Sequence, residues 1–376
     1  MTDRVLIIGA GIAGLALARA LYRDGIPYEL HERRERAADA GLAINLPGNA
    51  ISALGRLGLG EAITGVGYAV PRREYRTHRD RLMFQVDERE FWGTAAAPRC
   101  VRRIDLDRML RDGLPAGSIH EGVGVTAVRQ DGDGAEIDLA DGSTVRGGLV
   151  VGADGVRSTV RRAAFGDDGM RAALLSGASF RFMAPNPGVD CWTAWAGPHG
   201  SFMLIPVSPD EVYGFACATR GGPVEPDPAW LTQTFAGFPE PVRQTVKAVT
   251  GDPALLYHSP IEEVRVPRWA HGRTVLIGDA AHATAPVWAQ GAALGLEDAE
   301  VLAGLLAAGT PAPEAAREFE RLRRPRVTHV QTQTDRFSRT AAMPGWLRGL
   351  TAPLAGKASY RAAYRSLREW PGTPGR

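Results

Sequence analysis

Three segments of the chain alternate short apolar runs with longer amphipathic stretches. The apolar runs have the length and the β-branched content of buried strands, and they cover residues 4–8, 28–31, 149–151 and 274–277. After the first run, Leu15, Ala18 and Leu21 recur at helical spacing and predict a helix over residues 12–23. A strand, a glycine turn, a helix and a second strand together predict a Rossmann-like α/β domain.

Two stretches with a different amino-acid composition interrupt this pattern. Residues 71–98 and 176–267 are rich in Trp, Phe, Tyr and Pro, with strand-like runs at 201–205 and 212–218. They predict an inserted antiparallel β-sheet domain beside the α/β domain. The expected division is an α/β domain of residues 1–70, 99–175 and 268–340, an inserted domain of residues 71–98 and 176–267, and a C-terminal helical tail of residues 341–376.

The C-terminal part of the chain is typical of helices. Pro311 and Pro313 mark the boundary between two helices, and the charged stretch at 314–324 is interpreted as a solvated helix face. Trp346 and the Ala-rich residues after it predict a further helix that packs on the body of the protein.

Composition narrows the class of protein. The chain has 376 residues, 44% hydrophobic and 23% charged, which suits two globular domains and a tail. The net charge of +2 gives no reason to expect a nucleic-acid or membrane partner. We find no stretch with the length of a membrane helix or the form of a signal peptide, so we expect a cytoplasmic protein, as a monomer or a homodimer.

The residues that usually bind metals are scattered along the chain. Cys100, Cys191 and Cys217 lie far apart without a CxxC pair, which argues against a disulfide framework or a thiolate zinc site. The histidines lack the spacing of metal ligands, so no metal is expected.

The first apolar run leads into the turn Gly9-Ala-Gly11-Ile-Ala-Gly14. Gly9 allows a tight turn, Gly11 lets a pyrophosphate approach the backbone, and Gly14 allows close packing of helix on strand. The helix that follows directs its free N–H groups and its positive dipole end toward phosphates. Glu32, at the end of the second strand, suits the hydroxyls of an adenosine ribose. These features predict a bound dinucleotide, and by themselves they leave both FAD and NAD open.

Two further motifs place an acidic residue at a tight turn after an apolar strand. They are Asp154-Gly155 and Gly278-Asp279. With the N-terminal glycine turn, they resemble in order and spacing the three fingerprints of the class A flavoprotein monooxygenases, the para-hydroxybenzoate hydroxylase-like group. The resemblance covers roughly residues 1–335. It implies a Rossmann-like FAD-binding domain with an inserted antiparallel β-sheet substrate domain and C-terminal helices.

The resemblance also implies roles for individual residues. Asp279 is expected to accept a hydrogen bond from a ribityl hydroxyl of FAD, and Arg103 to reach the pyrophosphate or the ribityl chain. Asp154 and Gly155 are expected to support both the FAD site and the reaction with the nicotinamide cofactor, while Asn45 belongs to a loop near the isoalloxazine. The expected cofactor-binding residues are Gly9, Gly11, Ile12, Ala13, Gly14, Glu32, Arg33, Asn45, Arg103, Asp154, Gly155, Gly278, Asp279, Gln290, Gly291, Ala292 and Ala293.

After the third motif, the family pattern continues with a proline, a glycine-rich turn and a helix that carries Glu-Asp-Ala. The backbone at Pro286 is expected to line the face on which the flavin C4a-hydroperoxide forms. A helix that begins near Gly291 is expected to stabilise the reduced flavin through its dipole. The chain departs from the family at Ala289, where Gly is common, and at Ala293, where Asn is frequent.

Aromatic and apolar residues gather between residues 191 and 215. They are expected either to face an apolar substrate pocket over the flavin or to form ordinary sheet core, and they comprise Trp192, Trp195, Phe202, Met203, Tyr213 and Phe215. Candidates for a base that ionises the substrate are Arg181, His199 and Tyr213, which join Pro286 and Gly291 as the expected catalytic residues. His282 belongs to the third motif and is interpreted as structural.

The favoured function is oxygen insertion, in which NADH or NADPH reduces FAD and O2 then hydroxylates or epoxidises an aromatic or polyketide-like small molecule. The chain has no second GxGxxG for NAD(P)H, as in the resembled group, where the nicotinamide cofactor visits transiently. Halogenation, whose enzymes have a similar fold, is rejected. It needs a WxWxIP motif, whereas Cys191-Trp-Thr-Ala-Trp195 has a different spacing, and the required lysine is missing. A non-redox role of FAD, as in a cyclase or a binding protein, is the alternative.

Overall fold

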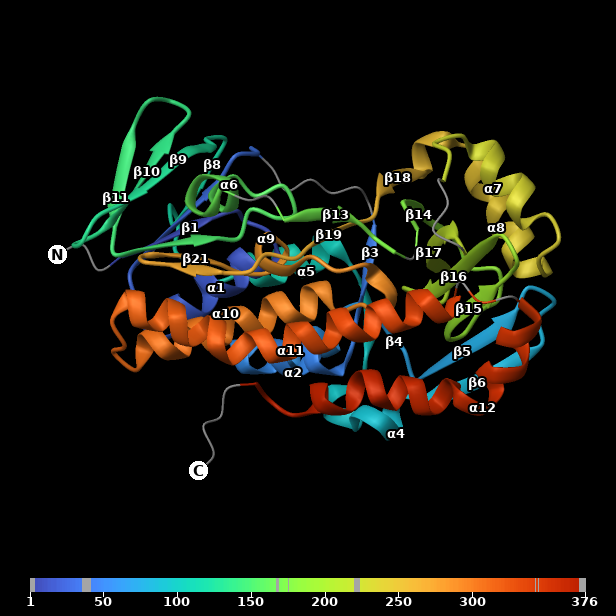
Figure 1. Cartoon of the computed structure of the whole chain (residues 1–376). Coiled ribbons are helices and arrows are strands. Elements are labelled where there is room, and N and C mark those ends of the chain that lie inside the picture. Colours follow the sequence, from blue (N-terminus) through green and yellow to red (C-terminus); the bar gives the residue numbers. More distant parts are fainter. Residues whose placement is uncertain are drawn as a thin grey trace.

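The apolar runs form a six-stranded sheet in one half of the molecule (Figure 1). The computed structural model describes residues 4–35, 42–166, 169–174, 176–219, 224–341, 343 and 345–371. The central strand β1 (Val5–Ile8) lies parallel to both of its neighbours, β12 (Leu149–Gly152) and β2 (Tyr28–Glu32). Because both faces of the sheet are covered, β1 and β12 are buried along their whole length, which explains their continuous apolar sequence. The outer strands are β8 (Ile119–Glu121) on one side, and β21 (Thr274–Leu276) and the antiparallel β20 (Ala270–His271) on the other.

Helices α1 (Ile12–Arg23) and α10 (Gly291–Ala307) pack against each other through small residues. A Cβ atom placed on Gly295 would lie 3.1 Å from the Cβ atom of Ala13, and one placed on Gly278 would lie 2.8 Å from the same atom. The beginning of α1 therefore fits directly against α10 and the end of β21. The long helix α11 (Ala312–Ala341) packs on α10 and continues toward the other half of the molecule (Figure 1).

Shorter elements surround this sheet. An antiparallel sheet of β9 (Val125–Gln130), β10 (Ala135–Leu139) and β11 (Thr144–Gly147) lies at the end of the molecule that carries the N-terminus (Figure 1). A second one joins β3 (Ala43–Leu46), β7 (Arg99–Arg102) and β4 (Tyr68–Ala69). The other elements here are α2 (Gly48–Leu54), the π-helical η1 (Gly55–Leu59), α3 (Gly60–Thr64), α5 (Arg103–Arg111), α6 (Thr159–Phe165), α9 (Asp279–His282), and the paired strands β13 (Met170–Ala172) and β19 (Glu262–Val264).

A seven-stranded sheet forms the other half of the molecule. Its order is β18 (Tyr257–Pro260), β14 (Ala178–Pro185), β17 (Glu211–Ala218), β16 (Gly200–Pro206), β15 (Trp192–Ala196), β5 (Arg72–Thr77) and β6 (Leu82–Asp87). The two runs predicted as strands are β16 and β17. The predicted antiparallel sheet is present, and it departs from that pattern at one place, where β15 and β5 run parallel. A long connection rather than a hairpin joins these two strands, so their relative direction is not imposed by a turn.

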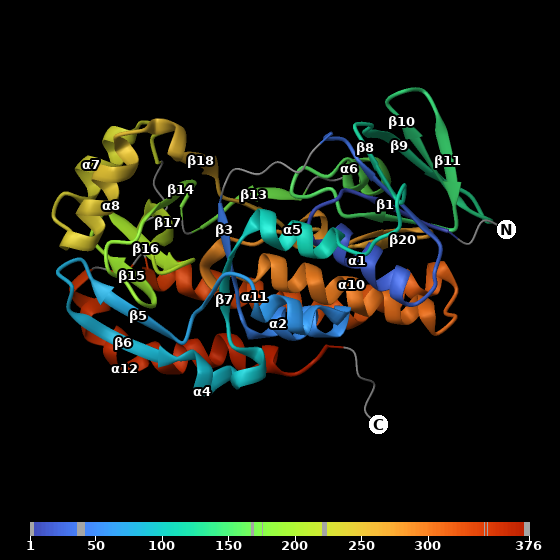
Figure 2. The same cartoon turned by 180° about the vertical axis from the view of Figure 1, so that it is seen from behind.

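Two helices cover one face of this sheet, namely α7 (Pro228–Phe235) and α8 (Glu240–Thr250) (Figure 1). At the bottom of both views, α12 (Gly345–Tyr364) packs along β6, close to α4 (Glu88–Trp92) (Figure 1, Figure 2). The predicted C-terminal helix is thus present, and its residues Tyr360 and Tyr364 are fully buried. The 3-10 turns are η2 (Thr94–Ala96), η3 (Pro253–Leu255), η4 (Pro286–Trp288) and η5 (Arg365–Arg368).

Candidate active site

The glycine turn between β1 and α1 leaves one side of the backbone open. Gly9 has a φ of +105°, and a Cβ atom there would lie 2.5 Å from the carbonyl oxygen of Ala153. A Cβ atom on Gly14 would lie 1.9 Å from the carbonyl oxygen of Gly9, so both positions require glycine. At Gly11, in contrast, a Cβ atom would meet nothing within 4 Å. A ligand can therefore approach the backbone at Gly11, just before the half-buried Ile12 that begins α1.

Glu32 is positioned by the same turn. One carboxylate oxygen accepts a hydrogen bond from the backbone N–H of Ala10 over 2.8 Å, and the other accepts one from the N–H of Arg34 over 3.0 Å. The carboxylate consequently stays beside the glycine turn, where the ribose of a bound nucleotide would lie. Arg33 is exposed next to it.

The carboxylate of Asp154 caps helix α6. It accepts hydrogen bonds from the Ser158 hydroxyl over 2.5 Å and from the N–H of Thr159 over 2.6 Å. Gly155 follows with a φ of +80°. Asp154 therefore shapes the turn through the N-terminus of α6, and its oxygens already have partners within the chain.

Sequence reasoning missed Arg161, a buried residue that joins the second and third motifs. Its guanidinium donates hydrogen bonds to the carbonyl oxygen of Ala280, in α9, over 2.7 Å and to that of Val156 over 2.6 Å. No local pattern distinguishes this arginine from its neighbour Arg162, which is exposed.

Asp279 begins α9 directly after Gly278, whose φ is +58°. The Asp279 side chain is exposed, and its Oδ1 lies 3.6 Å from the position that a Cβ atom would take on Gly291. The carboxylate of the third motif thus faces the first residue of α10, close to the free N–H groups of that helix.

The turn between α9 and α10 contains a residue in an unusual conformation. Pro286 is exposed, Trp288 is buried, and Ala289 adopts the left-handed region with a φ of 53° and a ψ of 35°. This is the position at which the family commonly has glycine, so the departure places a Cβ atom where glycine is favoured. At the start of α10, Ala292 is half-buried and Ala293 is fully buried.

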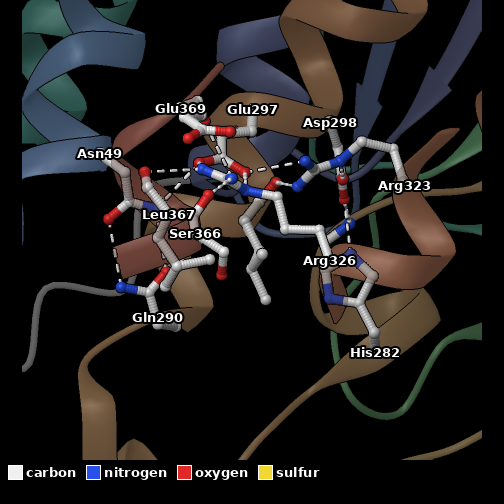
Figure 3. A network of polar contacts seen from close by, with 12 residues as sticks. Asn49, His282, Gln290, Glu297, Asp298, Arg323, Arg326, Ser366, Leu367 and Glu369 are labelled. Atoms are coloured by element: carbon white, nitrogen blue, oxygen red, sulfur yellow. Dashed lines mark hydrogen bonds and ion pairs between the residues drawn. The ribbon is translucent and has the colours of Figure 1, made fainter. Parts of the chain in front are cut away.

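Gln290 and Asn49 exchange two hydrogen bonds behind this turn (Figure 3). The amide nitrogen of Asn49 donates to Gln290 over 2.9 Å, and the amide nitrogen of Gln290 donates to Asn49 over 3.2 Å. Gln290 is 1% exposed, so its side chain is directed into the protein and only its backbone is left for a cofactor.

A buried network of charged side chains around Asp298 binds the backbone at Gly278 and the side chain of His282 (Figure 3). Asp298 accepts hydrogen bonds from the N–H of Gly278 over 2.9 Å and from Arg323 over 2.7 Å, and its carboxylate lies 2.6 Å from His282 Nε2. Burial raises the pKa of Asp298, but His282 and Arg323 outweigh it and lower that pKa to about 2. His282 therefore holds the carboxylate of Asp298 in place, in agreement with its interpretation as a structural residue.

Glu297 extends the network to the C-terminal residues. It accepts hydrogen bonds from Asn49 over 2.9 Å and from Arg326 over 2.7 Å, and it pairs with Arg323 over 2.8 Å. Arg326 also donates to three backbone carbonyls, each over 2.9 Å, those of Ser366, Leu367 and Glu369.

The interpretation of 314–324 as a solvated face is wrong for Arg323, which is fully buried. Glu297 and Asp298 stand together in α10, a helix that is apolar apart from these two residues and Glu300, and buried carboxylates need cationic partners. That pattern is the sequence signal that could have indicated a buried arginine on the following helix.

Strand register divides the predicted pocket residues between the two faces of the seven-stranded sheet. Trp195 is paired with Phe202, and both pack in the apolar cluster under α7 and α8. Their assignment to a pocket shared with the other aromatic residues is therefore corrected, because helices cover their face. The remaining members share the opposite face, which α7 and α8 do not cover and which is called the open face below. It turns toward the six-stranded half, where Ala43, Val70 and Cys100 pack against part of it, and its aromatic and apolar residues are Trp192, Met203, Tyr213 and Phe215.

Phe215 connects this open face with the turn before α10. Its ring packs in a small apolar cluster that includes Ile261 and Ala285, and Val287 packs against the same cluster. Ala285 and Val287 flank Pro286, so the sheet and the turn meet there.

The three candidate bases occupy different positions. Arg181 lies on the open face, paired with Phe215. Burial raises the pKa of Tyr213, so its hydroxyl stays protonated at neutral pH and suits a hydrogen-bond donor rather than a base. His199 is exposed in the turn between β15 and β16 and has no place on the open face.

A family model described as an FAD binding domain matches residues 2–334. The chain belongs to this FAD-binding family. The 3-amino-4-hydroxybenzoate 2-monooxygenase PtnB3 of Streptomyces platensis is 32% identical over 356 residues, which cover 88% of this chain and 86% of the relative. An FAD-dependent urate hydroxylase of Klebsiella pneumoniae is 30% identical over 339 residues, which cover 86% of each. The crystal structure of Klebsiella pneumoniae HpxO complexed with FAD and uric acid has a TM-score of 0.87 at 25% identity, covering 97% of both chains.

These findings confirm the predicted fold class, the FAD-dependent monooxygenase family and FAD as the cofactor. Within the described ranges, no helix is long and apolar enough to cross a membrane. The same described residues contain no group of three His, Cys, Asp or Glu side chains arranged for a metal ion.

The residues of this chain fit FAD. The amide of Asn45, on β3, is 6% exposed, and neither its nitrogen nor its oxygen has a hydrogen-bond partner among the residues that the structure describes. A buried amide without partners is costly, so a ligand that supplies a donor and an acceptor would stabilise it. Three features of the chain therefore suit a dinucleotide. They are the open backbone at Gly11 after β1, the exposed carboxylate of Asp279 beside the start of α10, and the unpaired amide of Asn45 on β3.

Proposed function

We propose that this enzyme takes electrons from NADH or NADPH and inserts one atom of O2 into an electron-rich aromatic small molecule. The apolar cluster that contains Ile261 and Ala285 carries the proposal, because Phe215 and Val287 both pack against it and so join the open face of the seven-stranded sheet to the turn around Pro286. A flat ring bound at this apolar junction would be shielded from water and held against a flavin. Bound FAD supplies the redox and oxygen chemistry, and the chain supplies orientation and exclusion of water.

We assign the cofactor contacts as follows. Gly9, Gly11 and Gly14 with the start of α1 hold the pyrophosphate, and Glu32 holds the adenosine ribose. Asp279 accepts a hydrogen bond from the ribityl chain, since its carboxylate is exposed at the N-terminus of α10. Gly291, Ala292 and Ala293 present the positive end of that helix to the pyrimidine side of the flavin. Arg103, exposed at the first position of α5, reaches the middle of the cofactor.

The names of the relatives support an aromatic substrate. The relatives act on 3-amino-4-hydroxybenzoate and on urate, according to their names, and both compounds are flat and electron-rich. In this chain Trp192, Met203 and Phe215 would enclose the ring, and the protonated hydroxyl of Tyr213 would donate a hydrogen bond to an oxygen of the substrate.

Four measurements test the proposal. Flavin released by heat should be identified as FAD by chromatography, and Asp279→Ala should lower FAD occupancy, because a hydrogen bond to a charged acceptor contributes about 1.5–3 kcal/mol. An aromatic substrate should accelerate NADH or NADPH oxidation, and reaction under 18O2 should leave one labelled atom in the product. If hydrogen peroxide accounts for all the oxidised NAD(P)H and no label enters any compound, the enzyme is an oxidase. If a ligand binds without flavin turnover, FAD has a structural role.

A further inference from the structure

We propose that Arg73 is a positioning residue for the flavin, which acts through Tyr364 to hold the turn of residues 286–290 in place. The proposal rests on the proposed function, because that function places the flavin against this turn. It gives a residue of the seven-stranded half of the molecule a role in the FAD site.

Arg73 and Glu88 form an ion pair in the interior of the protein. Arg73 lies on β5 and Glu88 begins α4, and both side chains are fully buried. Three aromatic rings surround the guanidinium, with centroids 5.2 Å (Trp192), 5.7 Å (Tyr360) and 5.5 Å (Tyr364) from its central carbon. A buried ion pair contributes little net stability compared with apolar side chains of the same volume. Stability alone therefore does not account for this pair.

The guanidinium of Arg73 fixes the direction of a chain of hydrogen bonds. Its Nη1 donates to the hydroxyl oxygen of Tyr364 over 3.3 Å, and that hydroxyl donates to the backbone carbonyl of Trp288 over 2.6 Å. Because a guanidinium has donors and no acceptor, the Tyr364 oxygen must accept from it, and the hydroxyl hydrogen is directed at the carbonyl. Burial raises the pKa of Tyr364, which keeps this hydroxyl protonated. Bonds in such a chain polarise one another, so loss of the first donor weakens the second bond.

The carboxylate that orients Arg73 is itself held by a second chain of hydrogen bonds. Tyr360 donates to Oε2 of Glu88 over 2.6 Å, and Nε1 of Trp92 donates to the Tyr360 hydroxyl over 3.1 Å. Tyr360 and Tyr364 lie one turn apart on α12, so one helix supplies both hydroxyls. The guanidinium of Arg73 therefore presents its Nη1 to Tyr364 from a fixed position.

The turn of residues 286–290 needs such support. Trp288 directly precedes Ala289, whose left-handed conformation, with a φ of 53°, is unfavourable for a residue with a Cβ atom. A conformation of this kind persists only where the surrounding structure holds it. The carbonyl of Trp288 belongs to the peptide that joins these two residues, so its bond to Tyr364 opposes relaxation of Ala289. Without the donor from Arg73, we expect the turn to relax and FAD to fit less tightly.

FAD affinity in a double-mutant cycle tests this proposal. Arg73→Lys keeps a positive charge beside Glu88 but replaces the planar fork with a single ammonium, so the donor to Tyr364 is lost. We expect Arg73→Lys and Tyr364→Phe each to weaken FAD binding by about three- to tenfold, measured by the fluorescence of released FAD. The double variant should bind FAD no more weakly than Tyr364→Phe alone, because Arg73 acts through that hydroxyl.

Rescue by glycine separates positioning of the turn from general stability. Glycine adopts the left-handed conformation without strain, so adding Ala289→Gly to Arg73→Lys should restore most of the lost FAD affinity. If Arg73→Lys does not fold, Arg73→Met combined with Glu88→Gln takes its place in the cycle and in the rescue, because it leaves no unpaired charge.

Arg72→Lys is the matched control. Arg72 precedes Arg73 on β5, projects to the opposite face of the sheet and pairs with Glu74 and Asp190. It should leave FAD affinity unchanged.

Unchanged FAD affinity in the Arg73 variant, additive effects of the two single variants, or no rescue by Ala289→Gly would each overturn the proposal. The proposed function is tested separately, by the 18O label in the product of the parent enzyme. A non-additive cycle without labelled product would support the role of Arg73 and refute the monooxygenase. Labelled product with an additive cycle would do the reverse.

Discussion

The hydroxyl of Tyr364 donates a hydrogen bond to the backbone carbonyl of Trp288 over 2.6 Å. Tyr364 ends helix α12, whereas Trp288 belongs to the turn between Pro286 and Gln290. The rings of the two residues also meet edge to face, with centroids 5.6 Å apart. A helix from the C-terminal part of the chain therefore holds the turn on which we place the flavin.

Replacing Tyr364 with phenylalanine should weaken this support. The variant leaves the buried carbonyl of Trp288 without its donor, so the free energy of unfolding should fall by about 1–3 kcal/mol. A less constrained turn should also raise the fraction of NAD(P)H oxidation that ends as hydrogen peroxide. Urea denaturation of the FAD-loaded enzyme and a peroxide assay measure the two effects. Tyr22→Phe is the control, since Tyr22 is 51% exposed and should alter neither quantity.

Ala289→Gly should stabilise the protein. The left-handed conformation of Ala289 costs about 1–2 kcal/mol, and glycine adopts it freely, although glycine adds about 0.5–1 kcal/mol of unfolded-state entropy. The free energy of unfolding should therefore rise by roughly 0.5–1 kcal/mol in a urea titration. The same change at Ala358, an exposed position within α12, should lower it by a similar amount. A destabilised Ala289→Gly variant would show that the left-handed conformation is not a source of strain.

The pKa of Asp298 predicts an acid-sensitive contribution to stability. Because that pKa falls from 3.8 to about 2 on folding, the carboxylate stabilises the native state above about pH 4 and loses this contribution as the pH falls through about 2. The magnitude is about 2 kcal/mol. Asp298→Asn should therefore lie well below the parent protein in unfolding free energy at about pH 6, and the difference should shrink toward about pH 3. A difference that stays constant over this range would contradict the assignment.

Arg326→Lys should release the C-terminal segment. A lysine cannot reach the carbonyls of Ser366, Leu367 and Glu369 together while it pairs with Glu297. Amide hydrogen exchange in residues 366–370 should become about tenfold faster or more, because local opening costs less. Arg317→Lys, which affects an exposed pair with Glu314, should leave exchange in this segment unchanged. Unchanged exchange in Arg326→Lys would show that packing, rather than the three carbonyl contacts, holds the segment.

Features set by local sequence could be predicted. The burial of β1 on both faces follows from its continuous apolar residues, and the requirement for glycine at Gly9 and Gly14 follows from the tight strand-to-helix turn. The third motif and the start of α10 near Gly291 were expected from the resemblance to the family.

Features set by long-range packing could not be predicted in the same way. The partners of Arg323 lie on α10, and no pattern within α11 indicates which of its arginines turns inward. The division of the aromatic residues between the two faces of the sheet could have been predicted from the sequence. Trp192 and Trp195 are three positions apart on one strand, so they must face opposite sides. Which side remains open depends on α7 and α8, and this is a tertiary property.

The contacts made by Arg326 and Tyr364 have a consequence for biosynthesis. As the nascent chain leaves the ribosome, β1 and α1 appear first, but β21, α10 and the residues around Leu367 that complete their surroundings appear late. The glycine turn and the apolar face of α1 therefore remain incompletely covered for most of translation. During this time they can bind chaperones or aggregate. Slower synthesis or lower temperature during expression should raise the soluble yield, and fragments that end before α12 should accumulate as insoluble protein.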